Sequence, residues 1–257
     1  MSEDSSIEVG MQSQETEENE DKRAFLKSSD TTVRIIDGLN LQGFQLGGGA
    51  IDFALGKYRR PHSDIDIVYV VESRTWDEYV SEPNKVPEER LSLQNVNQEP
   101  ELYGVQQTNP IAMERMGAPG IQMKGGELPL VVDFIEAYRS MEDGEEYIML
   151  PIYEGGSYIK IPQKEIIEKK IDNVIARVPT AEMQLLLKEQ CASVLESLKG
   201  GLLPDRRRKA SKDMEEVRRE ADLNKVKKLK EKKMGLNYSF SSTAKYRTAQ
   251  ILQIIAR

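Results

Sequence analysis

The chain has very few of the residues that build disulfide frameworks and zinc centres. It contains one cysteine, Cys191, and one histidine, His62, among 257 residues. A single cysteine excludes a disulfide within the chain and is typical of a reducing compartment. The two residues cannot supply a zinc site of the Cys/His type, and a Cys–His or Ser–His catalytic pair has only one histidine to draw on. Chemistry must therefore be sought in other residue types.

The chain also lacks long hydrophobic runs. No stretch approaches the roughly 20 apolar residues of a membrane-spanning helix, and no apolar signal-peptide core follows Met1. Apolar residues make up 39% of the chain and charged residues 31%. We therefore expect a soluble, cytoplasmic protein with no membrane partner, long enough for one large domain or two small ones.

Charge is distributed unevenly along the chain. The net charge is −7, yet residues 1–20 carry seven acids and no base, whereas residues 199–233 carry fourteen bases and seven acids. The Ser-, Glu- and Gln-rich residues 1–22 are predicted to form a disordered acidic tail. A globally acidic chain is not typical of a dedicated nucleic-acid binder, but the basic helix expected over 205–233 leaves an RNA partner open.

Most of the chemical information lies between Phe44 and Val71. A short apolar run ends in three glycines, and a compact apolar segment follows. Glycines between a strand and a helix let the backbone turn sharply and approach a ligand. The amides at the start of that helix favour an anion such as phosphate. Gly47 and Gly48 are therefore predicted to cradle phosphate, and Arg60 and Ser63 are candidate phosphate contacts from the turn that follows.

Two acids open the next predicted strand, which spans Ile65 to Val71. Alternate residues of a strand point to the same face, so Asp64 and Asp66 are expected to point the same way. Adjacent carboxylates repel each other unless a cation lies between them. Carboxylate oxygens near bound phosphates suit Mg²⁺. The pattern predicts a metal-dependent site for a nucleoside triphosphate.

A third acid interrupts a nearly all-apolar strand, Leu130 to Ile135. A continuous apolar run is typical of a central strand, where a buried carboxylate is costly without a partner. A metal shared with Asp64 and Asp66 would offset that cost for Asp133. Asp133 is thus predicted to be a metal ligand or a general base.

The glycine pair, the apolar half-turn ending at Gly56, the Arg-Pro-His-Ser turn and Asp-Ile-Asp together resemble the nucleotidyltransferase superfamily. The resemblance is greatest to aminoglycoside 2″-adenylyltransferases and lincosamide nucleotidyltransferases, over about thirty residues. It implies two Mg²⁺ ions held by Asp64, Asp66 and Asp133, with the last as the family's third carboxylate. It also implies ATP as donor and a small polar acceptor such as an aminoglycoside.

The remaining pattern predicts an α+β protein with a small mixed sheet of the polymerase-beta-like type and a helical C-terminal region. The division expected is a nucleotidyltransferase domain over 23–162 and a helical domain over 163–257. Strands are expected at 44–46, 65–71, 103–107, 120–123 and 130–135, and a hairpin at 147–152 and 158–161. A first helix is expected to start at Asp30 or Thr31 and to end at Gly38, and a short helix is expected around Trp76 and Tyr79. Further helices are expected at 50–55, 163–177, 180–199, 205–233 and 243–255.

The sequence thus predicts a Mg²⁺-dependent transfer of a nucleoside monophosphate to a hydroxyl acceptor. Two alternatives stay open. One is transfer to RNA or to a protein, as in toxin–antitoxin nucleotidyltransferases, with the basic 205–233 helix as the RNA track. The other is a regulatory module that binds nucleotide without turnover.

Overall fold

The structure is a computed structural model of the chain. It describes residues 4–96, 111–112, 120–125, 128–152, 157–197 and 204–237. The strand predicted at 103–107 and the helix predicted at 243–255 lie outside these residues. No helix in the described part is both long enough and apolar enough to cross a membrane.

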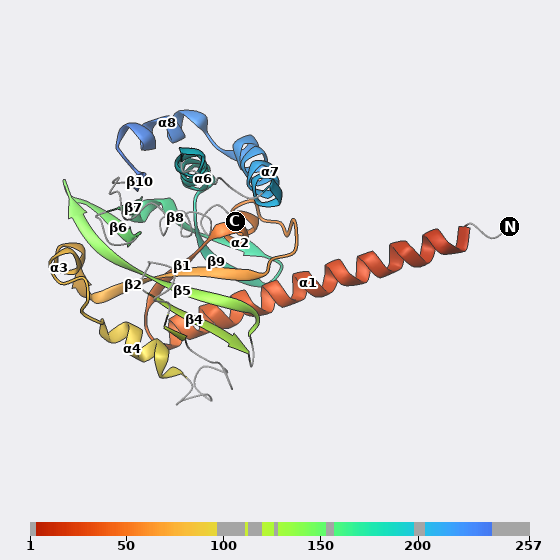
Figure 1. The fold of residues 1–257 in the computed structure, drawn as a ribbon, viewed down its shortest axis with the longest axis horizontal. Helices are drawn as coiled ribbons and strands as arrows, with labels where there is room; N and C mark the ends of the chain where they lie inside the picture. Colours follow the sequence, from red (N-terminus) through yellow and green to blue (C-terminus); the bar gives the residue numbers. More distant parts are fainter. Residues whose placement is uncertain are drawn as a thin grey trace.

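A mixed sheet forms the centre of the molecule (Figure 1). Its strands follow the order β1-β2-β5-β6-β7-β10, with β4 joined to β5 and β3 to β4. The strands are β1 (Gln42–Leu46), β2 (Asp64–Thr75), β3 (Ile111–Ala112), β4 (Gly120–Gly125), β5 (Leu128–Glu142), β6 (Glu145–Pro151), β7 (Tyr158–Pro162) and β10 (Gly235–Asn237). Among the described strands of this sheet, only β2 and β5 are parallel neighbours, and the other pairs are antiparallel. The predicted α+β class with a mixed sheet is confirmed.

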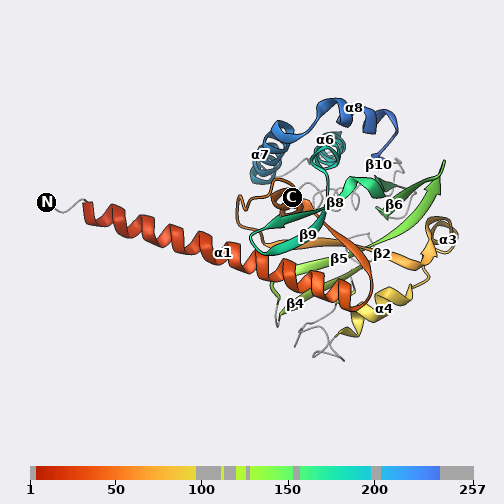
Figure 2. The ribbon, with the colours of Figure 1, turned by 180° about the vertical axis from the view of Figure 1, so that it is seen from behind.

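Helices surround the sheet on both faces. They are α1 (Asp4–Gly38), α2 (Gly47–Ala54), α3 (Trp76–Ser81), α4 (Glu88–Gln94), α6 (Ala181–Ser197), α7 (Pro204–Glu220) and α8 (Leu223–Glu231). Figures 1 and 2 show α6, α7 and α8 together on one side of the sheet and α1 on the other. The short helix predicted around Trp76 and Tyr79 is confirmed as α3, where Thr75 and Glu78 form a reciprocal cap.

Two hydrophobic clusters follow from the alternation of the strands. Val68 and Val70 of β2 belong to the cluster under α6, whereas Ile67 and Tyr69 belong to the cluster that includes Ile36 of α1. Successive strand residues point to opposite faces, so each strand supplies both clusters. Every even-numbered residue from 64 to 70 therefore points to the α6 face.

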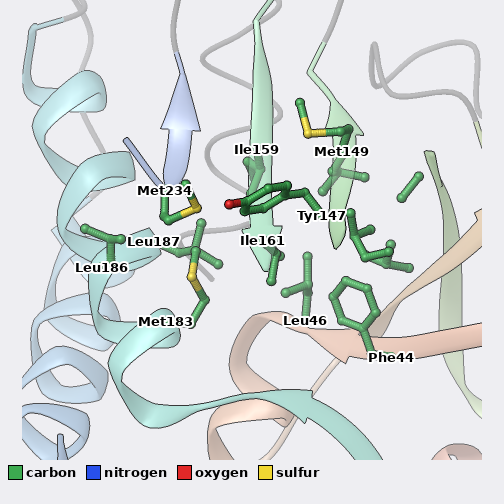
Figure 3. Packing of buried hydrophobic residues seen from close by; sticks show 14 of the residues in the cluster. Phe44, Leu46, Tyr147, Met149, Ile159, Ile161, Met183, Leu186, Leu187 and Met234 are labelled. Atoms are coloured by element: carbon green, nitrogen blue, oxygen red, sulfur yellow. The ribbon is translucent and has the colours of Figure 1, made fainter. Parts of the chain in front are cut away.

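The cluster under α6 fixes the C-terminal helices to the sheet. Figure 3 shows Met183, Leu186 and Leu187 of α6 packed with residues of β1, β6 and β7. The same cluster holds the single cysteine, Cys191, which is fully buried. Burial raises the pKa of its thiol to about 12, so the thiol stays protonated at neutral pH.

The helix predicted over 163–177 is wrong. A single 3₁₀ turn (Gln163–Glu165) leads into a hairpin of β8 (Ile166–Ile171) and β9 (Val174–Pro179). Asp172 at its two-residue turn has φ +50°, a conformation that Asp and Asn tolerate better than other residues with side chains. The β-branched residues of both strands favour this hairpin over a helix. The division of the chain into two domains at residue 162 stays a prediction.

Helix α1 begins much earlier than predicted. The expected start at Asp30 or Thr31 is wrong, and the structure gives helix from Asp4, through the residues predicted as a disordered tail. Glu, Gln and Met are good helix formers, and acids are favoured near a helix N-terminus. The packed end of α1, which includes the fully buried Phe25 and Ile35, provides a helix for these residues to extend.

The long helix predicted over 205–233 is divided in two. Asp222 interrupts it, and its side chain accepts hydrogen bonds from the backbone amides of Asn224 and Lys225. This cap starts α8 as a separate helix. Beyond α8, β10 pairs with β7 and returns the chain to the sheet.

Candidate functional site

The register of β2 and β5 places the three predicted acids on one face of the sheet. Asp66 lies directly opposite Asp133 in this parallel pair, and Asp64 lies two residues before Asp66 on the same strand. Paired residues of neighbouring strands point to the same face. All three acids therefore lie on the face that α6 and α7 cover.

Two of these acids are deeply buried. Asp66 and Asp133 are each 5% exposed, whereas Asp64 is half-buried at the start of its strand. Gln122 of β4 donates a hydrogen bond of 2.7 Å to Oδ1 of Asp133, and Ser63 donates one of 3.2 Å to Oδ1 of Asp64. Ser63, a predicted phosphate contact, thus hydrogen-bonds one of the three acids.

The glycine turn lies against Asp66. Helix α2 begins at Gly47, directly after Leu46, the residue that pairs with Asp66 in the β1–β2 ladder. Gly47 has φ +73°, and a Cβ atom there would lie 2.4 Å from Oδ2 of Asp66. The strand, the turn and the acid are therefore packed so closely that only glycine fits.

The start of α2 keeps its anion-binding character. Leu46 precedes it and provides no side-chain cap, and the first turn contains no acid. Unpaired amides at such an end favour an anion. Gly47, Gly48 and Gly49 are all buried, and the atom nearest to a Cβ built at Gly47 is Oδ2 of the Asp66 carboxylate.

The basic turn between α2 and β2 is fixed by a buried network of charges. Arg59 donates to Asp52 at 2.6 Å and to Asp213 of α7 at 3.0 Å. His62 Nε2 lies 2.9 Å from Asp52 Oδ2, and its ring packs on Phe25. Asp52 and His62 therefore hold the turn on α2 and α1, which is a structural role.

The predicted phosphate contact Arg60 faces Asp213. Its Nη2 donates to Oδ2 of Asp213 at 3.2 Å, and its Nε lies 3.5 Å from Oδ1. Burial would raise the pKa of Asp213, but Lys188 and then Arg60 and Arg59 outweigh it and hold the pKa below its usual value.

Lys188 is the residue near the site that sequence reasoning missed. It lies on α6, is 3% exposed, and its Nζ is 3.9 Å from Oδ2 of Asp213. Burial lowers the pKa of Lys188 to about 8, while Asp213 and, more weakly, Asp66 oppose that shift. The available signal was a lysine directly after the apolar run Leu185–Leu187, on the side of α6 that faces the sheet.

The three acids supply the oxygen ligands that a hard divalent cation prefers, but their side chains are not arranged as a metal-binding site. Carboxylate oxygens suit Mg²⁺, and two buried acids in register gain from a cation between them. In the parts of the chain that the structure covers, however, no three His, Cys, Asp or Glu side chains are grouped closely enough to hold a metal. Occupancy would require the three side chains to converge.

Comparison with known proteins gives matches in three-dimensional structure only. Neither a scan against protein-family models nor a search of curated proteins finds a match. The chain is similar to the lincosamide antibiotic adenylyltransferase LnuA with bound lincomycin (18% identity, 73% of this chain and 92% of that chain, TM-score 0.43). It is also similar to ANT(2″)-Ia with adenylyl-2″-tobramycin (18% identity, 78% of this chain and 90% of that chain, TM-score 0.47). Identities under 25% with TM-scores under 0.5 assign neither activity nor substrate.

Proposed function

We propose that this protein is a nucleotidyltransferase that moves a nucleoside monophosphate from a nucleoside triphosphate, with ATP as the default donor, to a hydroxyl acceptor. The observation that carries the proposal is the parallel register that pairs Asp66 with Asp133, with Asp64 on the same face. The adjacent uncapped start of α2 adds a place for the phosphates.

Asp64, Asp66 and Asp133 would hold Mg²⁺ in this proposal, with two ions expected from the sequence resemblance. The bound ions would neutralise charge on the triphosphate and make the acceptor hydroxyl easier to deprotonate. The convergence that this requires is small for Asp66 and Asp133, because their strands are hydrogen-bonded neighbours at these residues.

We assign phosphate binding and proton acceptance to groups of the protein itself. The amides at Gly47 and Gly48 would bind phosphate oxygens, joined by the hydroxyl of Ser63 and the guanidinium of Arg60. Asp133 would accept the proton of the acceptor hydroxyl as that oxygen attacks the α-phosphorus. Attack forms the new P–O bond, and the bond to the β-phosphate breaks and releases pyrophosphate.

The acceptor we propose is a small polar molecule of the aminoglycoside type. The net charge of −7 would attract a polycation. The test is to incubate the protein with α-labelled ATP, Mg²⁺ and a panel of aminoglycosides and lincosamides, and to follow which one becomes labelled.

The Asp64→Asn variant tests the chemistry itself. We expect loss of transfer in a folded protein, because Asp64 would lose its charge as a ligand. Asp77→Asn, an exposed acid at the start of α3, removes the same charge and should transfer as wild type does. Equal transfer by wild type and Asp64→Asn would show that Asp64 is not needed for the chemistry. No transfer by wild type to any acceptor would favour the alternative, a regulatory module that binds nucleotide without turnover.

RNA is a second candidate acceptor, favoured by one feature of the surface. Five exposed lysines gather on α8 and the two residues after it: Lys227, Lys228, Lys230, Lys232 and Lys233. Such a surface attracts phosphate backbones, and binding to it weakens as salt releases counterions. Labelled ATP with total RNA would show incorporation that falls steeply between low and physiological salt, whereas transfer to a small acceptor would change little.

A further inference from the structure

We propose that Asp213 of α7 is a positioning residue for the nucleotide site: it fixes Arg60 and Lys188 in place beside the glycine turn and β2. This inference rests on the proposed function. Asp213 lies 153 residues after Arg60 in the chain, on a helix with none of the predicted catalytic acids. Nothing in the sequence pattern links the two residues.

Both oxygens of Asp213 are engaged by cations. Oδ1 accepts from Arg59 Nη1 at 3.0 Å and lies 3.5 Å from Arg60 Nε. Oδ2 accepts from Arg60 Nη2 at 3.2 Å and lies 3.9 Å from Lys188 Nζ. One carboxylate, only 1% exposed, therefore joins three cations that come from the basic turn and from α6.

The three cations would repel one another without this carboxylate. Arg59 is 6% exposed, Lys188 is 3% exposed and Arg60 is 19% exposed, so solvent screens their repulsion poorly. Arg59 has two further acids, Asp52 and Glu216. Lys188 makes its one ion pair among the described residues with Asp213, so it depends more heavily on this carboxylate, and loss of the carboxylate should displace Lys188 first.

Asp213 and its three cations lie on elements that adjoin Asp64 and Asp66. The basic turn leads directly into Asp64, and α2 at its other end begins against Asp66. Helix α6 is fixed to the sheet by Met183, Leu186 and Leu187 on the same face that carries Asp66 (Figure 3). Asp213 thus connects the turn and α6 across the face where a triphosphate would lie.

Lys188 also has unused hydrogen-bonding capacity. Its Nζ is buried and has no hydrogen-bond partner, its only ion pair among the described residues being the 3.9 Å contact with Asp213. A buried ammonium with a single distant counter-charge gains from a second anion nearby. Asp213 therefore holds Lys188, beside Arg60, with hydrogen-bonding capacity left for an arriving phosphate.

The test measures ATP binding in the presence of Mg²⁺ by isothermal titration calorimetry, with the full chain. Asp213→Asn should weaken ATP binding about tenfold or more, because charge-assisted contacts that orient Arg60 are lost. Glu215→Gln is the matched control: it removes one charge from the same helix, where Glu215 is exposed and pairs with Arg219. The control should bind as wild type does.

A double-mutant cycle distinguishes the positioning of Arg60 by Asp213 from a general structural effect of the Asp213→Asn substitution. In an Arg60→Ala background, Asp213→Asn should change ATP affinity less than in wild type, because Arg60, one of the two cations it acts through, is absent. An equal loss of affinity in both backgrounds would overturn the inference. So would wild-type affinity in Asp213→Asn.

Three further outcomes have a defined meaning. If Asp213→Asn does not fold, Asp213→Glu is tested in its place, because it keeps the charge and displaces the carboxylate. An ATP affinity about threefold or more below that of wild type supports the inference, and wild-type affinity overturns it. If wild type binds none of ATP, GTP, CTP and UTP, the proposed function fails and the inference with it. If wild type binds and the variants bind equally, only the inference fails.

Discussion

Asp66 and Asp133 are direct partners across the only parallel strand pair of the described sheet. Both side chains are 5% exposed. Two acids in such a place repel each other and are stabilised by a cation that binds between them. The relationship joins residues 67 positions apart in the sequence and is the geometric basis of the proposed site.

Mg²⁺ should therefore stabilise the folded chain through these acids. A ligand that binds only the folded state adds about 2.7 kcal/mol at a concentration one hundred times its Kd. We expect Mg²⁺ to raise the Tm of wild type and of Asp77→Asn, but not that of Asp66→Asn, in thermal unfolding with and without EDTA. An equal Mg²⁺ effect on Asp66→Asn would exclude Asp66 as a ligand.

Gly47→Ala should be more destabilising than Gly56→Ala. Both glycines have positive φ, +73° and +68°, so each substitution costs about 1–2 kcal/mol of backbone strain. Only at Gly47 would the new Cβ meet another atom, Oδ2 of Asp66 at 2.4 Å, whereas Gly56 has nothing within 4 Å. Urea denaturation of both variants measures the difference, and equal losses of stability would contradict the contact with Asp66.

Lys188 should make stability depend on pH in a defined window. Burial lowers its pKa from 10.5 to about 8 in the folded chain. Between these values the unfolded chain binds more protons, so the free energy of unfolding rises with pH, by at most about 1.4 kcal/mol per unit. The measurement is the difference in unfolding free energy between wild type and Lys188→Met at pH 7 to 10. This difference should move in favour of wild type above about pH 8, and a constant difference would show that the lysine is not desolvated.

Arg90 should be important for stability although its partner Glu136 lies on the opposite face of the sheet from the three acids. It donates to the fully buried Glu136, at 2.8 Å from Nη2 and by a second bond from Nε. Tyr69 and Tyr138 donate to the same carboxylate at 2.8 and 2.9 Å. Arg90→Met leaves a buried charge without its counter-ion and should cost about 3–5 kcal/mol in chemical denaturation.

The control for Arg90 is an arginine in a more exposed pair. Arg139 pairs with Glu72 at 2.7 Å and also with Glu146, and the side chains of Arg139, Glu72 and Glu146 are 25%, 44% and 32% exposed. Such pairs contribute about 1 kcal/mol or less. A similar loss for Arg139→Met and Arg90→Met would show that the burial of Glu136 adds nothing.

The sequence predicted those parts of the fold in which the pattern of apolar residues fits only one type of secondary structure. The apolar strands at 65–71 and 130–135, the hairpin at 147–161 and the helix at 180–199 all lie where they were expected. The error at 163–177 arose because an apolar and charged mixture fits a helix as readily as a hairpin. Asp172-Asn173 was the turn signal that would have decided it.

The sequence by itself determined the chemistry that is available: three acids, a glycine turn and a basic turn, with one histidine and one cysteine among 257 residues. Strand alternation was enough to orient Asp64 and Asp66 together. Only the tertiary structure decided which strand lies beside β2 and that Asp66 faces Asp133. Only it brought Lys188 and Asp213 to Arg60, because helix packing depends on complementary surfaces and charges distant in the chain, which no local pattern encodes.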